Sequence, residues 1–141
     1  MPDAIIPKNE QQRLAALDNL GILYTPLEDR FDKITRTLCR MFHMPIAYVS
    51  LIDSDTQWIK SSQGLNLIST PRSTAICAQT LLADECIVCE DLSQDDRFKD
   101  NPFVTSGLNI RFYAGFNLKS RGQNIGTLCI VDDKPRKFSK E

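Results

Sequence analysis

The segment that decides the fold is 110-IRFYAGFNLKSRGQNIGTLCIVD-132, which has the pattern of two strands joined by a turn. Residues 110–119 alternate along an extended chain. One side of this strand carries Phe112, Ala114, Phe116 and Leu118, and the other carries Arg111, Tyr113, Gly115 and Asn117. Residues 120–123 have turn chemistry, and residues 125–132 return as a strand that is apolar on both sides. The sequence therefore predicts a hairpin whose second strand is covered on both faces.

A second apolar run, from Ile46 to Ile52, is typical of a central strand that is buried on both sides. Residues 53–55 have turn chemistry, and residues 57–62 are expected to form the partner strand, with Trp58, Lys60 and Ser62 on one face. A shorter strand is expected from Cys86 to Glu90. Strands that are apolar on both sides require a layer of helices or loops on each face of their sheet.

Helical signals flank these strands. The first helix is expected over residues 9–21 and the second from residue 25 to just before Pro45, because the residue preceding a proline avoids the helical region. A third helix is expected over residues 73–83, and residues 93–100 are expected to form one or two helical turns. This order predicts an α+β fold with a mostly antiparallel sheet.

Length and charge exclude several classes of protein. The 141 residues fit a single domain, 1–141, in which residues 1–8 are expected to be extended or disordered and residues 137–141 to begin a helix that is cut off. The net charge of -1 does not favour electrostatic binding to nucleic acid or to anionic lipid. No apolar run approaches the roughly 20 residues of a membrane span, and the N-terminus lacks the apolar core of a signal peptide. We expect a cytoplasmic protein with no nucleic-acid partner and no membrane insertion.

The cysteines support this localisation. There are five, an odd number without a secretion signal, which is typical of reduced thiols in the cytosol. Cys86 and Cys89 have C-x-x-C spacing, but the β-branched residues between them predict a strand, in which positions three apart point to opposite faces. We therefore interpret these two thiols as structural. With one histidine, His43, and no cluster at ligand spacing, the sequence predicts no metal site and no identifiable cofactor.

Six segments, in this order and at this spacing, resemble a GAF domain over residues 10–139. They are LAALDNLGILYTPLEDRFDKITRTLCRMF, PIAYVSLIDSDTQWIKSSQGL, TPRSTAICAQTLL, DLSQDDRFKDNPFV, IRFYAGFNLKS and IGTLCIVDDKPRKFS. The nearest likeness is to GAF domains at the N-terminus of bacterial diguanylate cyclases and sensor histidine kinases. The resemblance implies a central antiparallel sheet of five or six strands, of the GAF and PAS type, with the N-terminal helices on one face. It also implies a small-molecule pocket on the other face, under a short helix starting at Ser73 and the segment 91–108.

The hairpin supplies the first candidate ligand-binding residues. If Phe112 and Phe116 pack under the N-terminal helices, Arg111 and Tyr113 face the pocket. An arginine suits a carboxylate or a phosphate. The alternative is an ion pair that holds the neighbouring loop, with Asp91, Asp95, Asp96 and Asp100 as the available partners.

Further candidates come from the strand at residues 57–62 and from the expected pocket roof. Trp58 and Lys60 share a face and either line a ligand mouth or cover a sheet edge. Arg97 and Phe98 lie in the roof, where the alternative is a solvated arginine and a phenylalanine that fills the core. Cys77 lies beside the pocket, or is simply a small buried hydrophobe. The complete candidate set is Trp58, Lys60, Cys77, Asp91, Arg97, Phe98, Arg111 and Tyr113.

The sequence differs from two groups of related domains, and these differences narrow the range of possible ligands. Related domains that attach a linear tetrapyrrole have a histidine two residues after the cysteine, whereas Gln79 follows Cys77 at that spacing. The sequence signature of cyclic-nucleotide-binding relatives is also absent. No nucleophile elbow, phosphate loop or dinucleotide glycine pattern is present, and no catalytic residue is predicted.

The resemblance implies a non-catalytic sensory module that controls an output domain in the same chain or in a partner. Such domains commonly dimerise through terminal helices, so we expect a homodimer that uses the Leu14, Leu17 and Leu20 stripe, unless this stripe packs on the sheet. The alternative is a small thiol enzyme, because some stand-alone GAF proteins are free methionine sulfoxide reductases. Cys77, Cys86 and Cys89 are the thiols expected nearest the pocket, although their pattern does not match that enzyme.

Overall fold

The computed structural model describes residues 7–20, 29–65, 67–83, 85–106, 109–120 and 122–136. Their central feature is a six-stranded antiparallel sheet with the strand order β3-β2-β1-β6-β5-β4. The strands are β1 (Ile46–Ile52), β2 (Thr56–Gln63), β3 (Ser69–Pro71), β4 (Cys86–Cys89), β5 (Phe112–Ser120) and β6 (Gln123–Asp132). Four α-helices accompany them within these ranges: α1 (Glu10–Leu20), α2 (Asp29–Phe42), α3 (Cys77–Thr80) and α4 (Pro102–Thr105).

The predicted α+β class with an antiparallel sheet of five or six strands is confirmed, since the sheet has six. The expected strands agree with the observed ones to within two residues. The expected helix over residues 73–83 is wrong in extent. A 3₁₀ turn, η1 (Arg72–Thr74), is followed by an extended Ala75, so that only the four-residue α3 remains. Strand β3 and helix α4 were not predicted. The expectations for residues 1–6, 21–28 and 137–141 lie outside the described residues.

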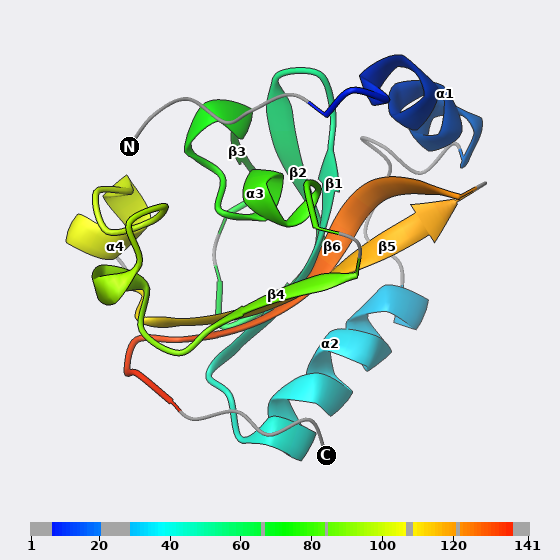
Figure 1. Cartoon of the computed structure of the whole chain (residues 1–141). Coiled ribbons are helices and arrows are strands. Elements are labelled where there is room, and N and C mark those ends of the chain that lie inside the picture. Colours follow the sequence, from blue (N-terminus) through cyan, green and yellow to red (C-terminus); the bar gives the residue numbers. More distant parts are fainter. Residues whose placement is uncertain are drawn as a thin grey trace.

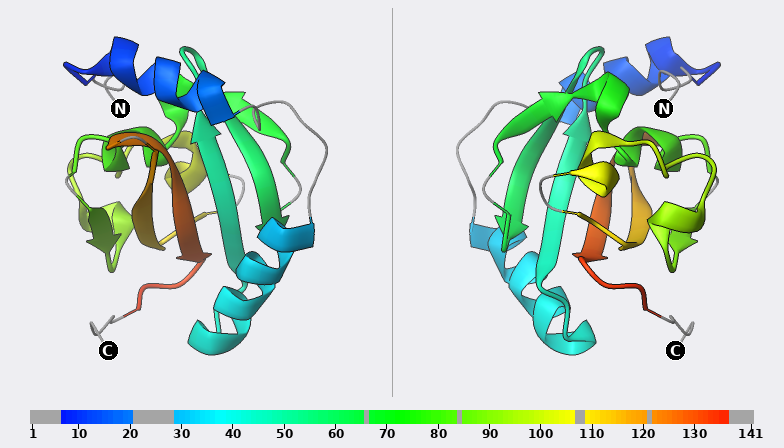
Figure 2. Two further views of the ribbon diagram at one scale, coloured as in Figure 1. Left: turned by 90° about the vertical axis from the view of Figure 1, so that its right-hand side faces the viewer. Right: turned by 90° about the vertical axis from the view of Figure 1, so that its left-hand side faces the viewer.

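Helices cover both faces of the sheet, as Figure 1 shows. Helix α2 lies along β1 and β2 (Figure 2) and packs with Leu38, Cys39 and Phe42 on Phe112 and other buried side chains of the sheet. The opposite face lies against α3, α4 and a second 3₁₀ turn, η2 (Leu92–Gln94), and it carries Tyr113. Phe112 and Tyr113 therefore point to the two opposite faces, as the alternation predicts.

One apolar side chain differs from expectation, and a second follows the alternative that the sequence left open. Phe116 is 40% exposed instead of packing under the N-terminal helices. Leu17 of α1 is fully buried with Leu51 and Ile125, so this member of the leucine stripe packs on the sheet. No helix among the described residues combines the length and the apolar character that a membrane crossing needs.

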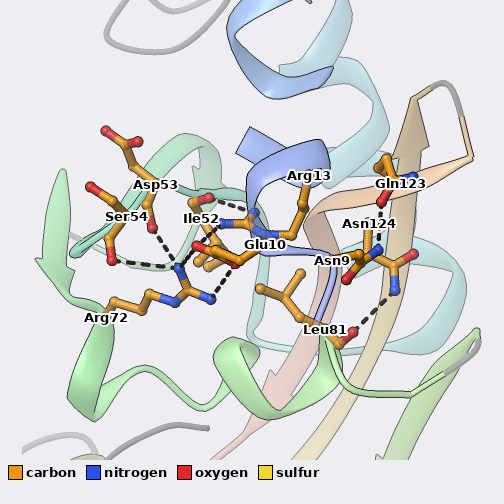
Figure 3. Close-up of polar contacts among 10 residues, drawn as sticks. All are labelled: Asn9, Glu10, Arg13, Ile52, Asp53, Ser54, Arg72, Leu81, Gln123 and Asn124. Carbon is orange, nitrogen blue, oxygen red and sulfur yellow. Dashed lines mark hydrogen bonds and ion pairs between the residues drawn. The ribbon is translucent and has the colours of Figure 1, made fainter. Parts of the chain in front are cut away.

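A buried ionic network fixes the start of α1 (Figure 3). Arg13 and Arg72 are 1% and 3% exposed, and both guanidinium groups donate hydrogen bonds to the carboxylate of Glu10. Arg13 also donates to the carbonyl oxygen of Ile52 at 2.6 Å, and Arg72 donates to that of Asp53 at 3.1 Å. The network thus joins α1 to the β1–β2 turn and to η1.

We expect the substitution Glu10→Gln to lower the free energy of unfolding at pH 7 by about 3 kcal/mol, because it leaves two buried guanidinium groups without their anion. Burial raises the pKa of Glu10, but hydrogen bonds and charges of Arg13 and Arg72 outweigh this and lower it from 4.5 to about 2. The stabilisation is therefore complete above pH 4.5 and is lost as the pH falls toward 2. Urea unfolding at several pH values measures both effects.

The matched control is Glu85→Gln, which removes an exposed carboxylate. It should leave the unfolding free energy within about 0.5 kcal/mol of the parent protein. Equal losses in the two variants would contradict the role assigned to the network.

Candidate functional site

An apolar pocket lies on the face of the sheet that carries α3 and α4. About 400 Å³ of space lies between its walls, including the part that is open to solvent. Strands β1 and β2 form its floor, and residues of the β2–β3 loop, of α4 and of the segments before α3 and β5 form its walls. The lining residues are Ile46, Tyr48, Gln57, Ile59, Leu65, Leu67, Thr70, Ile76, Phe103 and Ile110.

Gln57 is the main polar group of this pocket. Its side-chain Nε2 donates to Thr70 Oγ1 at 2.9 Å, and the residue is only 5% exposed. Its Oε1 is buried and has no hydrogen-bond partner among the described residues. A buried acceptor without a partner costs about 1–3 kcal/mol, and a ligand that donates a hydrogen bond removes this cost. The lining contains no charged side chain, so the pocket suits a small, uncharged molecule with one donor.

A group of hydroxyls and thiols lies directly behind the pocket wall. The hydroxyl of Tyr48, whose residue lines the pocket, lies 3.2 Å from Cys77 Sγ. The Tyr113 hydroxyl lies 2.8 Å from Thr80 Oγ1 and donates to Cys77 Sγ at 3.3 Å. The two sulfurs of Cys77 and Cys129 are 3.4 Å apart. Thr127 Oγ1 lies 3.0 Å from Cys129 Sγ. We call Tyr48, Cys77, Tyr113, Thr127 and Cys129 the tyrosine–thiol cluster.

The cluster is tightly packed at Gly115. A Cβ atom at Gly115 would stand 2.1 Å from the Tyr113 hydroxyl, so glycine is required there for Tyr113 to lie flat along its own strand. Burial raises the pKa values of Tyr48 and Tyr113 well above 10, and both hydroxyls therefore stay protonated and serve as hydrogen-bond donors.

Of the predicted ligand-binding residues, the structure brings Cys77 and Tyr113 together in the tyrosine–thiol cluster, but neither lines the pocket. Trp58 and Lys60 lie on the other face of the sheet, which corrects the expectation of a ligand mouth. Trp58 packs with Leu17 and Leu51, and the Lys60 ammonium lies 5.8 Å from the Phe31 ring of α2. The reason is the strand register: Trp58 pairs with Leu51, whose side chain faces α1.

Arg111 serves neither of its two expected roles. It is placed just before β5, and its Nη1 donates to the carbonyl oxygens of Val104 at 2.7 Å and Ile110 at 3.0 Å. It therefore fixes the end of the α4 segment on the sheet. No ligand-facing position and no aspartate contact is recorded for it among the described residues.

The three candidates in the predicted roof also have structural roles. Asp91 caps η2 by accepting from the Ser93 backbone N–H at 3.0 Å. Arg97 is 49% exposed and pairs with Asp95 at 2.9 Å, while Phe98 is fully buried in the core. These are the alternatives that the sequence left open for Arg97 and Phe98. No group of three potential metal ligands lies together in the described parts of the chain.

The sequence interpretation missed the residues that do line the pocket. Gln57 and Ile59 could have been found, because they occupy the strand face opposite Trp58 and Lys60. Leu65, Leu67 and Phe103 come from irregular segments, which have no periodic pattern to indicate where a side chain points.

Comparisons with known proteins agree with this architecture. The GAF domain family model matches residues 26–141. A curated relative, the cyclic di-GMP phosphodiesterase PA2567 of Pseudomonas aeruginosa, is 38% identical over 131 residues, which are 92% of this chain and 22% of that protein. The chain thus spans about a fifth of the length of this relative.

Solved structures show the same fold. The GAF domain of an Acinetobacter phosphoenolpyruvate-protein phosphotransferase is 19% identical and has a TM-score of 0.64, with 92% of this chain and 82% of that one covered. The free methionine-R-sulfoxide reductase of Neisseria meningitidis is 20% identical and has a TM-score of 0.65, with 92% and 77% covered. With a family model that spans most of its length, the chain belongs to the GAF domain family.

Proposed function

We propose that this GAF domain is a non-catalytic sensory module of a bacterial cytoplasmic signalling protein, and that it binds a small uncharged molecule. The observation that carries the proposal is the buried, unpartnered Oε1 of Gln57 in an otherwise apolar pocket. An acceptor in this position recognises an N–H or O–H group of a ligand whose remaining surface is apolar.

The absence of charge in the pocket lining supports this class of ligand. Burying an ionised carboxylate or phosphate without a partner is costly, and Arg111, the cation expected to receive one, binds backbone oxygens instead. The phosphodiesterase named among the relatives is much longer than this chain. We therefore assign any cyclic dinucleotide chemistry to an output domain that this module regulates.

Signalling requires a ligand that distinguishes two arrangements of the domain. The pocket walls come from several elements, since Ile46 lies in β1, Ile76 directly precedes α3 and Phe103 lies in α4. A ligand that fills the pocket therefore fixes the positions of α3 and α4 relative to the sheet. A coupling of about 1–3 kcal/mol to the output domain is the usual magnitude.

Indole and indene provide a matched pair of probes, since the two rings have the same shape and only indole has an N–H donor. We expect indole to bind about fivefold more tightly, because one hydrogen bond to a buried acceptor contributes about 1 kcal/mol. Calorimetric titration or the displacement of pocket resonances in NMR spectra measures the two affinities. Indole-3-acetate, which carries a carboxylate, should bind more weakly than either.

The variant Gln57→Leu should remove the preference for indole and retain the binding of indene. The control Gln94→Leu replaces an exposed glutamine outside the pocket and should leave both affinities unchanged. Equal affinities of indole and indene for the parent protein, or tighter binding of the carboxylate, would show that Gln57 does not select the ligand.

We also propose a homodimer, with α2 in place of the stripe on α1 as the contact surface. Ile34 and Met41 are 44% and 66% exposed and lie seven residues apart, so they share one side of this helix. This surface is free of the sheet, whereas Leu17 of α1 is buried against it.

Sedimentation equilibrium at tens of micromolar should give twice the chain mass for the parent protein. Met41→Glu should shift the equilibrium to the monomer, since it places a charge in an apolar contact. The control Ile68→Glu changes a residue that is 69% exposed near β3 and should leave the dimer intact. A monomeric parent protein would remove this part of the proposal.

Reduction of free methionine sulfoxide is a second candidate function, favoured by one observation. The Cys77 and Cys129 sulfurs lie in contact behind Tyr48, which lines the pocket. The uncharged lining offers no partner for the ammonium and carboxylate of an amino acid, so this function ranks second. Turnover with methionine sulfoxide and a thiol reductant that is lost in Cys77→Ser would reverse this order.

A further inference from the structure

Two cysteines that are far apart in the sequence meet in the core of the domain. Cys77 begins α3 and Cys129 lies in β6, and both residues are fully buried. Their sulfurs are 3.4 Å apart. A disulfide joins its sulfurs at about 2.05 Å, so an approach of roughly 1.4 Å would connect them. Because α3 is a helix of only four residues, flanked by turns, this approach involves one short element.

Hydroxyl groups contact the two thiols within an otherwise apolar core. The Tyr113 hydroxyl donates to Cys77 Sγ and also lies 3.4 Å from Cys129 Sγ. Tyr48 reaches Cys77 Sγ from the pocket side, and Thr127 Oγ1 lies 3.0 Å from Cys129 Sγ. The hydroxyls therefore stabilise negative charge on sulfur.

The hydrogen bonds make the two sulfurs chemically different. Burial by itself raises the pKa of Cys77, but hydrogen bonds from Cys129, Thr127, Tyr113 and Tyr48 outweigh it and lower the pKa to about 6. Burial and the neighbouring Cys77 raise the pKa of Cys129 well above its ordinary value. A thiolate at Cys77 is the form that attacks a peroxide, and Cys129 lies in contact with it as the resolving thiol.

The apolar pocket adjoins this pair through Tyr48. Tyr48 and Ile76 both line the pocket, the Tyr48 hydroxyl contacts Cys77 Sγ, and Ile76 is the residue before Cys77. Hydrogen peroxide is uncharged and hardly larger than water, so it meets the requirements of this lining.

We propose that Cys77 and Cys129 are a redox modification site, which a hydroperoxide converts into a reversible disulfide. This inference goes beyond the proposed ligand binding and does not depend on it. In the first step, the Cys77 thiolate attacks one peroxide oxygen, the O–O bond breaks, and a sulfenic acid and hydroxide form. In the second step, Cys129 attacks the Cys77 sulfur, the S–O bond breaks, and water leaves with the Cys129 proton.

The balance of the reaction is complete. The hydroxide of the first step takes up the proton that Cys77 released when it ionised, so two thiols and one hydrogen peroxide give one disulfide and two waters. The two sulfurs lose two electrons in total and the peroxide gains them. A small thiol reductant reverses the modification by exchange through a mixed disulfide.

The bond would change the wall of the apolar pocket. It ties α3 directly to the central strand β6 and removes the thiolate to which Tyr48 is hydrogen-bonded. Since Tyr48 is also a lining residue, disulfide formation changes the contacts of a side chain in the pocket wall.

The test is peptide mapping of the whole chain after treatment with hydrogen peroxide in the folded state. Unreacted thiols are blocked with N-ethylmaleimide in denaturant, and the protein is cleaved with trypsin and a glutamate-specific protease. Cleavage after Glu85 separates Cys77, in fragment 73–85, from Cys86 and Cys89, while Cys129 lies in fragment 122–136. We expect these two fragments to be linked, with a loss of about 2 Da relative to the free thiol forms. Dithiothreitol should separate them again.

Two sets of variants control the assignment. The double variant C86S/C89S, which removes the thiols of β4, should retain the link, whereas C77A and C129A should each abolish it. Circular dichroism checks that each variant is folded. If a core variant does not fold, the peptide map of the parent protein still shows whether Cys77 and Cys129 are linked. The same treatment in urea should give mixed pairings.

Several results would overturn the proposal. In the first, Cys86 and Cys89 are linked while Cys77 and Cys129 both carry N-ethylmaleimide. In the second, only Cys86 is oxidised and the core pair is again blocked by N-ethylmaleimide. In the third, the link between Cys77 and Cys129 forms only in urea. The failure of indole to bind would leave this inference intact, and the absence of the disulfide would leave the pocket proposal intact.

Discussion

The burial of the central strands on both faces is the constraint on which the rest of the structure depends. All seven side chains of β1 are buried, and its neighbour β6 is almost as completely enclosed. A sheet of this kind is stable only between two layers. Helix α2 is long enough to supply one of them, whereas the other consists of short elements such as α3 and α4, each of four residues. Such short elements leave part of the face unfilled, and the apolar pocket lies there.

Much of the sheet could be predicted from the sequence because alternation along a strand is a local property. The opposite directions of Phe112 and Tyr113 follow from their adjacent positions in one strand. The placement of Trp58 and Lys60 cannot be predicted in this way. Alternation indicates that the two side chains share a face of the sheet, but it does not indicate which face. The pairing of Trp58 with Leu51 and the irregularity between Val49 and Ser50 decide this, and both are properties of the assembled sheet.

The candidate site was harder to predict because its contacts are not local. Arg111 was expected to bind an anion, yet backbone oxygens satisfy it as well as a carboxylate would, and composition does not distinguish the two. Cys77 and Cys129 are 52 residues apart and have no common motif. Their contact arises because α3 lies over the strand β6. To predict this contact from the sequence, one would need to know both the order of the strands and the position of α3.

One short segment connects the three polar features of the domain. Thr70 accepts the hydrogen bond of Gln57 in the pocket, Arg72 binds Glu10 at the start of α1, and Cys77 contacts Cys129 in β6. These three residues lie within eight consecutive positions, so a displacement of the segment alters the pocket, the ionic network and the thiol pair together. The ionic network holds one end of this segment against α1 with charge-assisted hydrogen bonds in a buried setting. Through Arg72 and Glu10, the segment that forms part of the pocket wall is thus joined directly to α1.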